Sequence, residues 1–527
     1  MSAAPASPAL LGPPAPTVLQ AVWEASQRWP ARRAHLGPDG AIAYAELWDR
    51  AQAVAAWHEA QPPPGPVLVY GHKEPAMLVA FLGAALAGRP YVPTDTVLPL
   101  GRVRRIAVLS GSTAWLAPRS PRETPVGGAE PGLVLGAAGE LVPPRPRRPQ
   151  DPAPDPLAYI LFTSGSTGDP KGVPIPWSAV AHFVGWMRSQ QRLEPGREVV
   201  LNQAPFSFDL SVMDLYLALT TGGTLVSIPR GMVQDPRTLF PALAAADLTV
   251  WVSTPSFAQF CLAEPTFGAG MLPRLRRMLF CGETLPAATA RALLQRFPEA
   301  EVWNTYGPTE TTVAVTSVRI TPELAAGPDP LPVGAPAPGM RVWVAGPDLA
   351  ELAPGEAGEV VIAGPQVSPG YLAGPAAGRG FVSLPPARGG GTAYRTGDAG
   401  YARDGQLFCV GRLDRQVKLH GYRLELDEIE AHLTRLDGVC AAAVLPVVRE
   451  GRVQHLVAFV VAEPAPDPAG AFAAAQQLRH ELGGSLPPYA IPRLIRFLPA
   501  LPLTPNGKVD RRHLEALAEQ RDAPPKG

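Results

Sequence analysis

Short apolar runs alternate with longer amphipathic segments over most of this chain. Apolar residues recur at helical spacing over 18–29, 44–60 and 76–87, which predicts three helices. The runs at 67–70 and 157–162 are short and continuously apolar, and they predict buried strands. Because helices and strands alternate in this way, we expect layered α/β structure.

The same alternation continues through the middle of the chain. Between residues 199 and 320 three further strands are expected, at 225–228, 248–252 and 277–280. Residues 341–410 contain several short apolar runs separated by Gly and Pro, which indicates a small β-rich lobe. By contrast, residues 118–156 are rich in Pro, Gly and Arg and are expected to form a loop.

A boundary between two domains is predicted near residue 414. The segment from Gly411 to Arg415 lies between two β-like runs, and we place a hinge at Asp414. After it, acidic residues at 427–430 suit the start of a helix. The apolar runs at 442–445 and 456–460 predict strands, so this part reads as a compact α+β module.

We therefore expect an α/β fold in three parts. Residues 1–16 form a disordered tail, and residues 17–413 form a large N-terminal domain of layered α/β subdomains with the β-rich lobe. Residues 414–527 form a small, mobile α+β C-terminal domain. The length of 527 residues also exceeds what one hydrophobic core normally supports.

Composition narrows the class of protein. Lys plus Arg and Asp plus Glu number 46 each, and this balance argues against a dedicated nucleic-acid binder. The N-terminus has no signal-peptide pattern, and no apolar run reaches the roughly 18 residues of a membrane span. The four cysteines are far apart and form no metal-binding or disulfide pattern. We expect a cytoplasmic protein without membrane insertion.

A candidate phosphate-binding loop directly follows the strand predicted at 157–162. It combines small hydroxyl residues, glycines and one cation: Thr163, Ser164, Gly165, Ser166, Thr167, Gly168 and Lys171. Backbone N–H groups, hydroxyls and a lysine after a buried strand suit a bound phosphate. The spacing is not that of a P-loop. A flexible Gly/Ser linker is the alternative for this loop taken alone.

Two further segments have residue types that suit a nucleotide. One contains Asn304, Thr305, Tyr306, Gly307, Pro308, Thr309 and Glu310. An exposed Tyr306 can stack on a purine ring, and Glu310 can bind Mg²⁺ on phosphate oxygens. In the other, Asp398 can accept both hydroxyls of a ribose, and Arg412 after Gly411 can add donors. Taken singly, a packed tyrosine and a turn aspartate explain these residues.

A fourth segment lies near the C-terminus, where Lys508 follows Pro505, Asn506 and Gly507. By itself, such a lysine is usually a solvated surface cation. Its meaning depends on the other three segments.

Together, in this order and spacing, the four segments resemble the adenylate-forming superfamily, which includes amino-acid adenylation domains, acyl-CoA synthetases and luciferases. The resemblance covers residues 17 to about 515. It implies that a carboxylate attacks the α-phosphate of ATP, that pyrophosphate leaves, and that a thiol captures the acyl-adenylate.

Further segments narrow the resemblance. Matches occur at 204–214, 253–257, 279–283, 311–316 and 418–423. This set is more similar to the D-alanine–D-alanyl carrier protein ligase family than to peptide-synthetase adenylation domains. It implies that D-alanine is activated and passed to the phosphopantetheine thiol of a carrier protein.

The chain contains one segment, Leu482 to Leu486, that is similar to the serine motif of carrier proteins. Its two glycines suit the end of a helix better, and no carrier-sized segment surrounds it. We therefore expect the carrier protein to be a separate chain.

The resemblance also implies roles for individual residues. ATP would be bound by the phosphate loop, residues 304–309, Asp398, Gly411 and Arg412, and Mg²⁺ by Glu310. Lys508 would be catalytic and contact both the α-phosphate of ATP and the substrate carboxylate. The C-terminal domain would then rotate about Asp414, withdraw Lys508 and bring Gly421 to the site.

The amino-acid pocket is implied to contain Lys508 and five other residues, namely Phe208, Asp209, Cys281, Gly307 and Val313. Asp209 would hold the substrate ammonium, since a buried aspartate needs a cation partner. Cys281 would favour the D-enantiomer by crowding the methyl group of the L-isomer. The alternatives are a helix cap for Asp209 and an ordinary buried apolar residue for Cys281.

Three alternative functions fit parts of the pattern. The nearest is an adenylation enzyme for another small amino acid, which would also use Asp209. An acyl-CoA synthetase is more distant, because a fatty acid offers no ammonium group. A non-catalytic adenylate-binding module would not need Lys508, Glu310 and Asp398 together.

Overall fold

The computed structural model describes residues 18–60, 65–119, 121, 123, 125, 132–135, 155–165, 168–372, 380–386, 390–419, 421–449, 452–467, 469–504 and 508–520. The predicted tail at 1–16 lies outside these residues, as do Ser166 and Thr167 of the phosphate loop.

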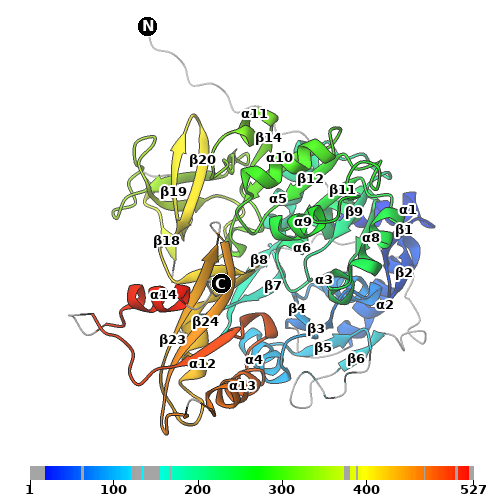
Figure 1. Ribbon diagram of the computed structural model, residues 1–527. Coiled ribbons are helices and arrows are strands. Elements are labelled where there is room, and N and C mark those ends of the chain that lie inside the picture. The colour runs from blue at the N-terminus through cyan, green and yellow to red at the C-terminus, as the bar shows by residue number, and fades with distance from the viewer. Residues whose placement is uncertain are drawn as a thin grey trace.

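The larger of two extensive sheets has nine strands (Figure 1). In spatial order they are β15 (Ala335–Pro336), β14 (Thr316–Ile320), β13 (Glu301–Tyr306), β12 (Arg277–Phe280), β11 (Val250–Ser253), β9 (Val199–Asn202), β10 (Thr224–Ser227), β1 (Arg33–Gly37) and β2 (Gly40–Ala43). From β13 to β1 neighbouring strands are parallel. The expected alternation of strands and helices is therefore confirmed here.

The second extensive sheet has six strands. Their order is β6 (Gly132–Val134), β5 (Ala114–Ala117), β3 (Val67–Gly71), β4 (Tyr91–Asp95), β7 (Leu157–Thr163) and β8 (Lys171–Pro176). Strand β6 lies within the segment that we expected to be only loop. It pairs in parallel with β5, and its three residues are too few for a sequence pattern to reveal them.

Five helices share one apolar core with both extensive sheets. They are α1 (Val18–Arg28), α2 (Tyr44–Glu59), α3 (Pro75–Leu86), α5 (Trp177–Gln190) and α6 (Leu210–Thr221). Their apolar side chains form one cluster with Val67, Val250 and other residues of the two sheets. All residues of α6 are buried, as expected for a helix that is covered on every side.

Further helices cover the outer faces of these sheets. They are α4 (Leu100–Ser110), α7 (Arg230–Val233), α8 (Pro236–Ala245), α9 (Pro255–Leu262), α10 (Ala287–Arg296) and α11 (Pro322–Ala326). Strand β11 shows the resulting alternation, because Val250 and Val252 face the central helices while Trp251 packs among α8, α9 and α10. A strand buried on both faces reads as a continuous apolar run.

The predicted β-rich lobe is a five-stranded sheet of β16 (Arg341–Ala345), β17 (Gly358–Ala363), β18 (Phe381–Ser383), β19 (Thr392–Arg403) and β20 (Gln406–Arg412). We call residues 414–520 the C-terminal unit. It contains β21 (Gln416–Leu419), β22 (Tyr422–Glu425), α12 (Leu426–Leu433), β23 (Val439–Arg449), β24 (Arg452–Ala462), α13 (Ala471–Leu482), β25 (Leu494–Phe497) and α14 (Arg511–Gln520). In Figure 1 the orange β23–β24 hairpin lies below the yellow lobe. Helix α13 ends at Leu482 with Gly483 as its C-cap, as expected.

One carboxylate links four parts of the C-terminal unit. Glu430 of α12 accepts hydrogen bonds from Arg415, which precedes β21, from Arg511 of α14 and from the backbone N–H of Val444 in β23. Its side chain is only 16% exposed. A hydrogen-bonded charge at such a site stabilises the arrangement because removing it leaves several donors without a partner.

We expect Glu430→Gln to lower the free energy of unfolding of the C-terminal unit by about 2 kcal/mol, since charge-assisted bonds are replaced by weaker ones. Denaturant titration with a probe in this unit would measure the loss. Glu481→Gln is the matched control, because Glu481 accepts a single exposed bond from Gln477. Equal stability of Glu430→Gln and the control would contradict the expectation.

Candidate active site

The candidate site lies where parallel strands of the nine-stranded sheet end. In neighbouring strands Ser253, Phe280 and Asn304 are paired in register. The loops that follow carry the predicted site residues Cys281 and Gly307. Open α/β sheets bind ligands at the carboxyl ends of their strands, so the fold brings these residues together for a general reason.

Two connected hollows occupy this region. We call the smaller one, of about 130 Å³, the inner cavity, and the larger one, of about 1120 Å³, the outer groove. Predicted residues that line the inner cavity are Thr163, Ser164, Phe208, Asp209, Tyr306, Gly307, Pro308, Thr309, Asp398, Arg412 and Gly421. Asn304, Thr305 and Gly411 line the outer groove.

The phosphate loop begins at the end of β7, as predicted. The Thr163 hydroxyl is buried and has no hydrogen-bond partner among the described residues. The Ser164 hydroxyl donates to the carbonyl of Arg423 at 2.9 Å. Gly168 closes the turn by donating to the Gly165 carbonyl at 3.0 Å. A buried hydroxyl without a partner suits a ligand with acceptor oxygens.

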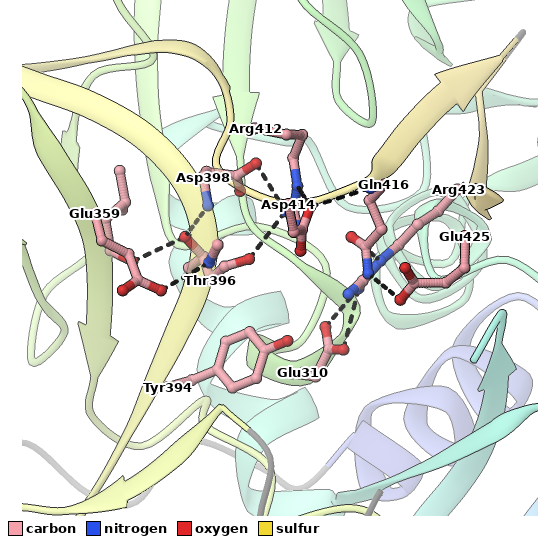
Figure 2. Close-up of polar contacts among 12 residues, drawn as sticks. Glu310, Glu359, Tyr394, Thr396, Asp398, Arg412, Asp414, Gln416, Arg423 and Glu425 are labelled. Atoms are coloured by element: carbon pink, nitrogen blue, oxygen red, sulfur yellow. Dashed lines mark hydrogen bonds and ion pairs between the residues drawn. The ribbon is translucent and has the colours of Figure 1, made fainter. Parts of the chain in front are cut away.

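Asp398 is the centre of a small hydrogen-bond network (Figure 2). Its Oδ1 accepts from Arg412 at 2.9 Å, and its Oδ2 accepts from the Tyr306 hydroxyl at 2.7 Å. Arg412 also donates to both carboxylate oxygens of Asp414. A carboxylate oxygen has two lone pairs, so Asp398 retains acceptor capacity toward a ribose.

Tyr306 differs from the expected exposed tyrosine, because it is only 7% exposed. Its ring packs with Val315, Ala337 and Met340, and burial raises its pKa well above the ordinary value. The side chain still lines both hollows, so part of it is open to a ligand there. Tyr306 therefore has a packing role as well as its predicted one.

The neighbours of Tyr306 hold the loop in place. Asn304 donates to the Pro332 carbonyl at 2.8 Å, and Thr305 donates to the Phe280 carbonyl at 2.8 Å. At Gly307 a Cβ atom would lie 2.7 Å from Cα of Ala314. Only glycine therefore fits at position 307 without a shift of the backbone.

Asp209 lies at the start of α6, but its side chain makes no capping hydrogen bond. The cap alternative therefore does not account for it. Burial raises the pKa of Asp209, while a hydrogen bond with Thr309 opposes the rise. A carboxylate in this position is stabilised by a bound cation, and an ammonium group in the inner cavity would supply one.

Cys281 and Val313 are buried in contact with each other, and neither is among the residues that line the two hollows, although the Asp209 charge acts on Cys281. The Cys281 thiol lies 3.6 Å from the Val313 carbonyl, and the two residues are 3% and 1% exposed. Burial raises the pKa of Cys281, so the thiol is neutral and acts as a packing group. Thr312 and Val313 have φ angles of 61° and 69°, which β-branched residues rarely adopt. Such strain is concentrated at functional sites.

Glu310 is the most deeply buried acid of the site, with 0% exposure. Arg423 of β22 donates to its two oxygens at 3.1 and 2.8 Å (Figure 2). The Tyr371 hydroxyl donates to Glu310 at 2.6 Å. Burial alone would raise the pKa of Glu310, but Arg423 lowers it to about 2. The predicted metal-binding carboxylate is thus paired with a guanidinium from the C-terminal unit.

Further polar contacts join the C-terminal unit to the rest of the site. Besides the Ser164–Arg423 bond, Lys171 is 3.2 Å from Glu425, and Arg102 is 2.7 Å from Glu428. The backbone N–H of Gly421 donates to Glu283. A Cβ atom at Gly421 would lie 2.7 Å from Cγ2 of Thr254, so this approach also requires glycine.

Lys508 lies away from the candidate site, whereas Gly421 lines it. Lys508 is exposed and, among the described residues, is not one that lines either hollow. Its backbone N–H donates to the Thr504 hydroxyl at 3.2 Å. In this structure the β21–β22 hairpin, and not the Lys508 segment, faces the site. The catalytic role of Lys508 stays a prediction.

Several residues of the site have no role predicted from the sequence. These are Tyr371, Gln416, Tyr422, Arg423, Glu425 and Tyr489. Alternation offered one signal, because Arg423 and Glu425 are two residues apart and so share one face of a strand. Nothing local shows that this face meets Glu310 and Lys171.

The described residues contain no group of three or more His, Cys, Asp or Glu side chains arranged for a metal ion. A single carboxylate such as Glu310 can still bind Mg²⁺ together with phosphate oxygens and water. No helix within the described part of the chain is long and apolar enough to cross a membrane.

Comparison with known proteins identifies the class. The family described as AMP-binding enzyme matches residues 22–372, and its C-terminal domain matches residues 428–508. The chain therefore belongs to the AMP-binding enzyme family.

Within this family the chain is similar to D-alanine–D-alanyl carrier protein ligases. That of Bacillus licheniformis is 42% identical over 508 residues, which cover 94% of this chain and 99% of the relative. That of Bacillus velezensis is 41% identical over 520 residues, which cover 94% and 98%.

Solved structures support the same fold. PA1221, an NRPS protein containing adenylation and PCP domains, has a TM-score of 0.80 at 28% identity, covering 97% of this chain and 85% of that chain. The Vibrio cholerae adenylation domain AlmE has a TM-score of 0.80 at 22% identity, covering 98% and 100%. At the latter identity the likeness concerns the fold alone.

We expect Arg423→Gln to release the C-terminal unit from this orientation, because a buried Glu310 left without its cation costs about 3 to 5 kcal/mol. Small-angle X-ray scattering would detect the change as a departure from the profile of this structure. Arg493→Gln, at an exposed arginine of the same unit, should retain the wild-type profile. Identical profiles for both variants would contradict the expectation.

The pH dependence of this ion pair has a definite sign. The folded-state pKa of Glu310 is depressed from 4.5 to about 2, so the pair stabilises this orientation fully above pH 4.5. The stabilisation is lost as the pH falls from 4.5 toward 2. The scattering profile of the wild type should therefore be constant between pH 5 and pH 8, roughly the range of greatest stability for most proteins.

Proposed function

We propose that the chain is an ATP-dependent ligase that activates D-alanine as D-alanyl-AMP and transfers it to the phosphopantetheine thiol of a separate carrier protein. The observation that carries this proposal is the buried Asp209, which lines the inner cavity without a capping hydrogen bond and whose charge acts on the nearby buried Cys281 thiol. The identity of 42% to such a ligase supports the same substrate. Its place of work is the cytoplasm, where the carrier would meet it.

Asp209 binds the ammonium group of the amino acid in this proposal. Phe208, Cys281, Gly307 and Val313 surround the small side chain. The fixed contact between Cys281 and the Val313 carbonyl leaves little room for adjustment, so a pocket of this kind selects by shape. A methyl group of the wrong configuration would meet the thiol.

ATP occupies the remaining part of the site. Thr163, Ser164 and Lys171 bind its phosphates, with Ser166 and Thr167 of the same loop. Asp398 and Arg412 bind the ribose, and Tyr306 borders the adenine together with the loop from Asn304 to Thr309. The unpartnered Thr163 hydroxyl and the free acceptor capacity of Asp398 support this assignment.

Glu310 binds Mg²⁺ when the C-terminal unit is turned away. A divalent cation held there would supply positive charge to the phosphates of ATP. Glu310 fits this role because it is ionised at neutral pH and already holds a cationic group. Arg423 and the cation would use the same carboxylate in two different orientations of the chain.

The two half-reactions use two orientations of the C-terminal unit, with the hinge at Asp414. In one, Lys508 reaches the substrate carboxylate and the α-phosphate, and D-alanyl-AMP forms. In the other, Gly421 and the β21–β22 hairpin face the site, as in this structure, and the outer groove admits the phosphopantetheine arm. The exposure of Lys508 and the contacts of Gly421 support the assignment of this structure to the second orientation.

Amino-acid-dependent release of pyrophosphate tests the function directly. D-alanine should give the highest kcat/KM among D-alanine, L-alanine, glycine and D-serine, and a holo carrier protein should then be loaded as a thioester. Preference for another amino acid would overturn the D-alanine assignment and favour the nearest alternative, an adenylation enzyme for that amino acid. No amino-acid dependence at all would overturn the ligase.

Asp209→Asn should raise KM for D-alanine, and lower kcat/KM for pyrophosphate release at least about 100-fold, because a charge-assisted bond to the ammonium is lost. Asp247→Asn, at an exposed position, is the matched control and should leave kcat/KM unchanged. A small effect of Asp209→Asn would remove Asp209 from substrate binding.

Lys508→Ala and Gly421→Ala should separate the two half-reactions. Lys508→Ala should abolish release of pyrophosphate, since the charge that stabilises the attacked phosphate is gone. Gly421→Ala should leave that step intact and slow thioester formation at least about tenfold, because its Cβ clashes with Thr254. If both variants slowed the same step, the assignment of two orientations would be wrong.

A further inference from the structure

Two tyrosines of the C-terminal unit lie between the inner cavity and the outer groove. Tyr422 is the first residue of β22, and Tyr489 lies in a short 3₁₀ turn at 488–490. Tyr489 lines both hollows, and Tyr422 lines the outer groove. We call these two side chains the aromatic lid.

The aromatic lid packs directly on the amino-acid end of the site. The two tyrosine rings stack with centroids 3.7 Å apart and an interplanar angle of 16°. The edge of this stack meets Phe208, at 4.9 Å and 87° from Tyr422 and at 6.5 Å from Tyr489. Phe208 immediately precedes Asp209 and lines the inner cavity together with Tyr489, so Tyr489 forms part of the wall of that cavity and Tyr422 packs behind it.

A polar network of the larger domain holds the lid from the other side. The Tyr422 hydroxyl lies close enough to Arg230 for a hydrogen bond. Arg230 donates to Asp95 at 3.3 Å, and Asp95 is 2.7 Å from the His72 ring. The network is partly buried, since the side chain of Asp95 is 3% exposed. The lid is therefore fixed at its ring faces and at one hydroxyl.

Water exclusion matters at this site because an acyl-adenylate is a reactive mixed anhydride. If the thiol attacks the carbonyl carbon, the C–S bond forms, the bond to the phosphate oxygen breaks, AMP leaves and the thiol proton passes to solvent. If water attacks instead, the products are the free amino acid and AMP. Closed sites favour the first outcome by keeping water away from the intermediate.

We propose that Tyr422 and Tyr489 are positioning residues that close the amino-acid end of the site in this orientation and shield the acyl-adenylate from water. The outer groove stays open to a thiol while the lid covers Phe208. This inference rests on the proposed function, because it concerns the lifetime of the adenylate that the function forms.

The lifetime of enzyme-bound D-alanyl-AMP tests the lid. The complex is formed from labelled D-alanine, ATP and Mg²⁺, desalted, and its decay to D-alanine and AMP is followed without carrier protein. Tyr489→Leu should shorten the half-life about tenfold, because a flexible aliphatic side chain cannot cover the same area. The rate of pyrophosphate release in the first turnover should stay within about twofold of the wild type.

Three further variants separate shielding from stability. Tyr489→Phe keeps the ring and should restore the wild-type half-life. Tyr422→Phe removes only the bond to Arg230 and should shorten the half-life less than Tyr489→Leu does. Phe472→Leu is the matched control, because Phe472 lies on α13 and is 75% exposed; it should have no effect. Melting temperatures of all four variants would exclude general unfolding.

The outcomes are distinct. A wild-type half-life for Tyr489→Leu, with normal formation of the adenylate, would overturn the lid and leave the proposed function intact. Equal shortening in Tyr489→Phe would also overturn it, because the ring would then be irrelevant. If the wild type forms no D-alanyl-AMP, the proposed function fails and the lid fails with it.

Discussion

The buried ion pair between Glu310 and Arg423 is the contact on which the arrangement of the site depends. Glu310 follows a strand of the larger domain and is 0% exposed, so its ionised form requires a cation partner. Here the cation is Arg423 of β22. The ion pair therefore also positions the neighbouring residues Gly421, Tyr422 and Glu425 at the site. One carboxylate thereby fixes how the C-terminal unit meets the larger domain.

A second ion pair, between Lys171 and Glu425, also joins the C-terminal unit to the larger domain. Lys171, a proposed phosphate ligand, is paired with Glu425, while Glu310, a proposed Mg²⁺ ligand, is paired with Arg423. Strand β22 therefore presents the negative group of Glu425 to Lys171 of the phosphate loop and the positive group of Arg423 to Glu310. The charges that ATP and its cation would neutralise are neutralised by protein in this orientation, which is why the site can close without them.

Much of this could be predicted from the sequence. Continuous apolar runs revealed β7 and β12 because both faces of these strands are buried, and the candidate residues Thr163 and Cys281 lie at or just after the ends of these strands. The expectation of an exposed Tyr306 was wrong, because its ring is packed and its hydroxyl donates to Asp398. Arg423 and Tyr489 could not be assigned, because Arg423 pairs with Glu310, 113 residues away in the chain, and Tyr489 packs against Phe208, which is still more distant. Only the folded arrangement of the two domains brings these residues together.

The central claim is that Arg423 serves the orientation in which the thiol reacts and not the formation of the adenylate. Single-turnover kinetics of Arg423→Gln with D-alanine, ATP and holo carrier protein tests it most directly. The account predicts D-alanyl-AMP formation at close to the wild-type rate and thioester formation slowed at least about tenfold, since only one orientation loses its ion pair. Equal slowing of both steps, or of neither, would contradict it.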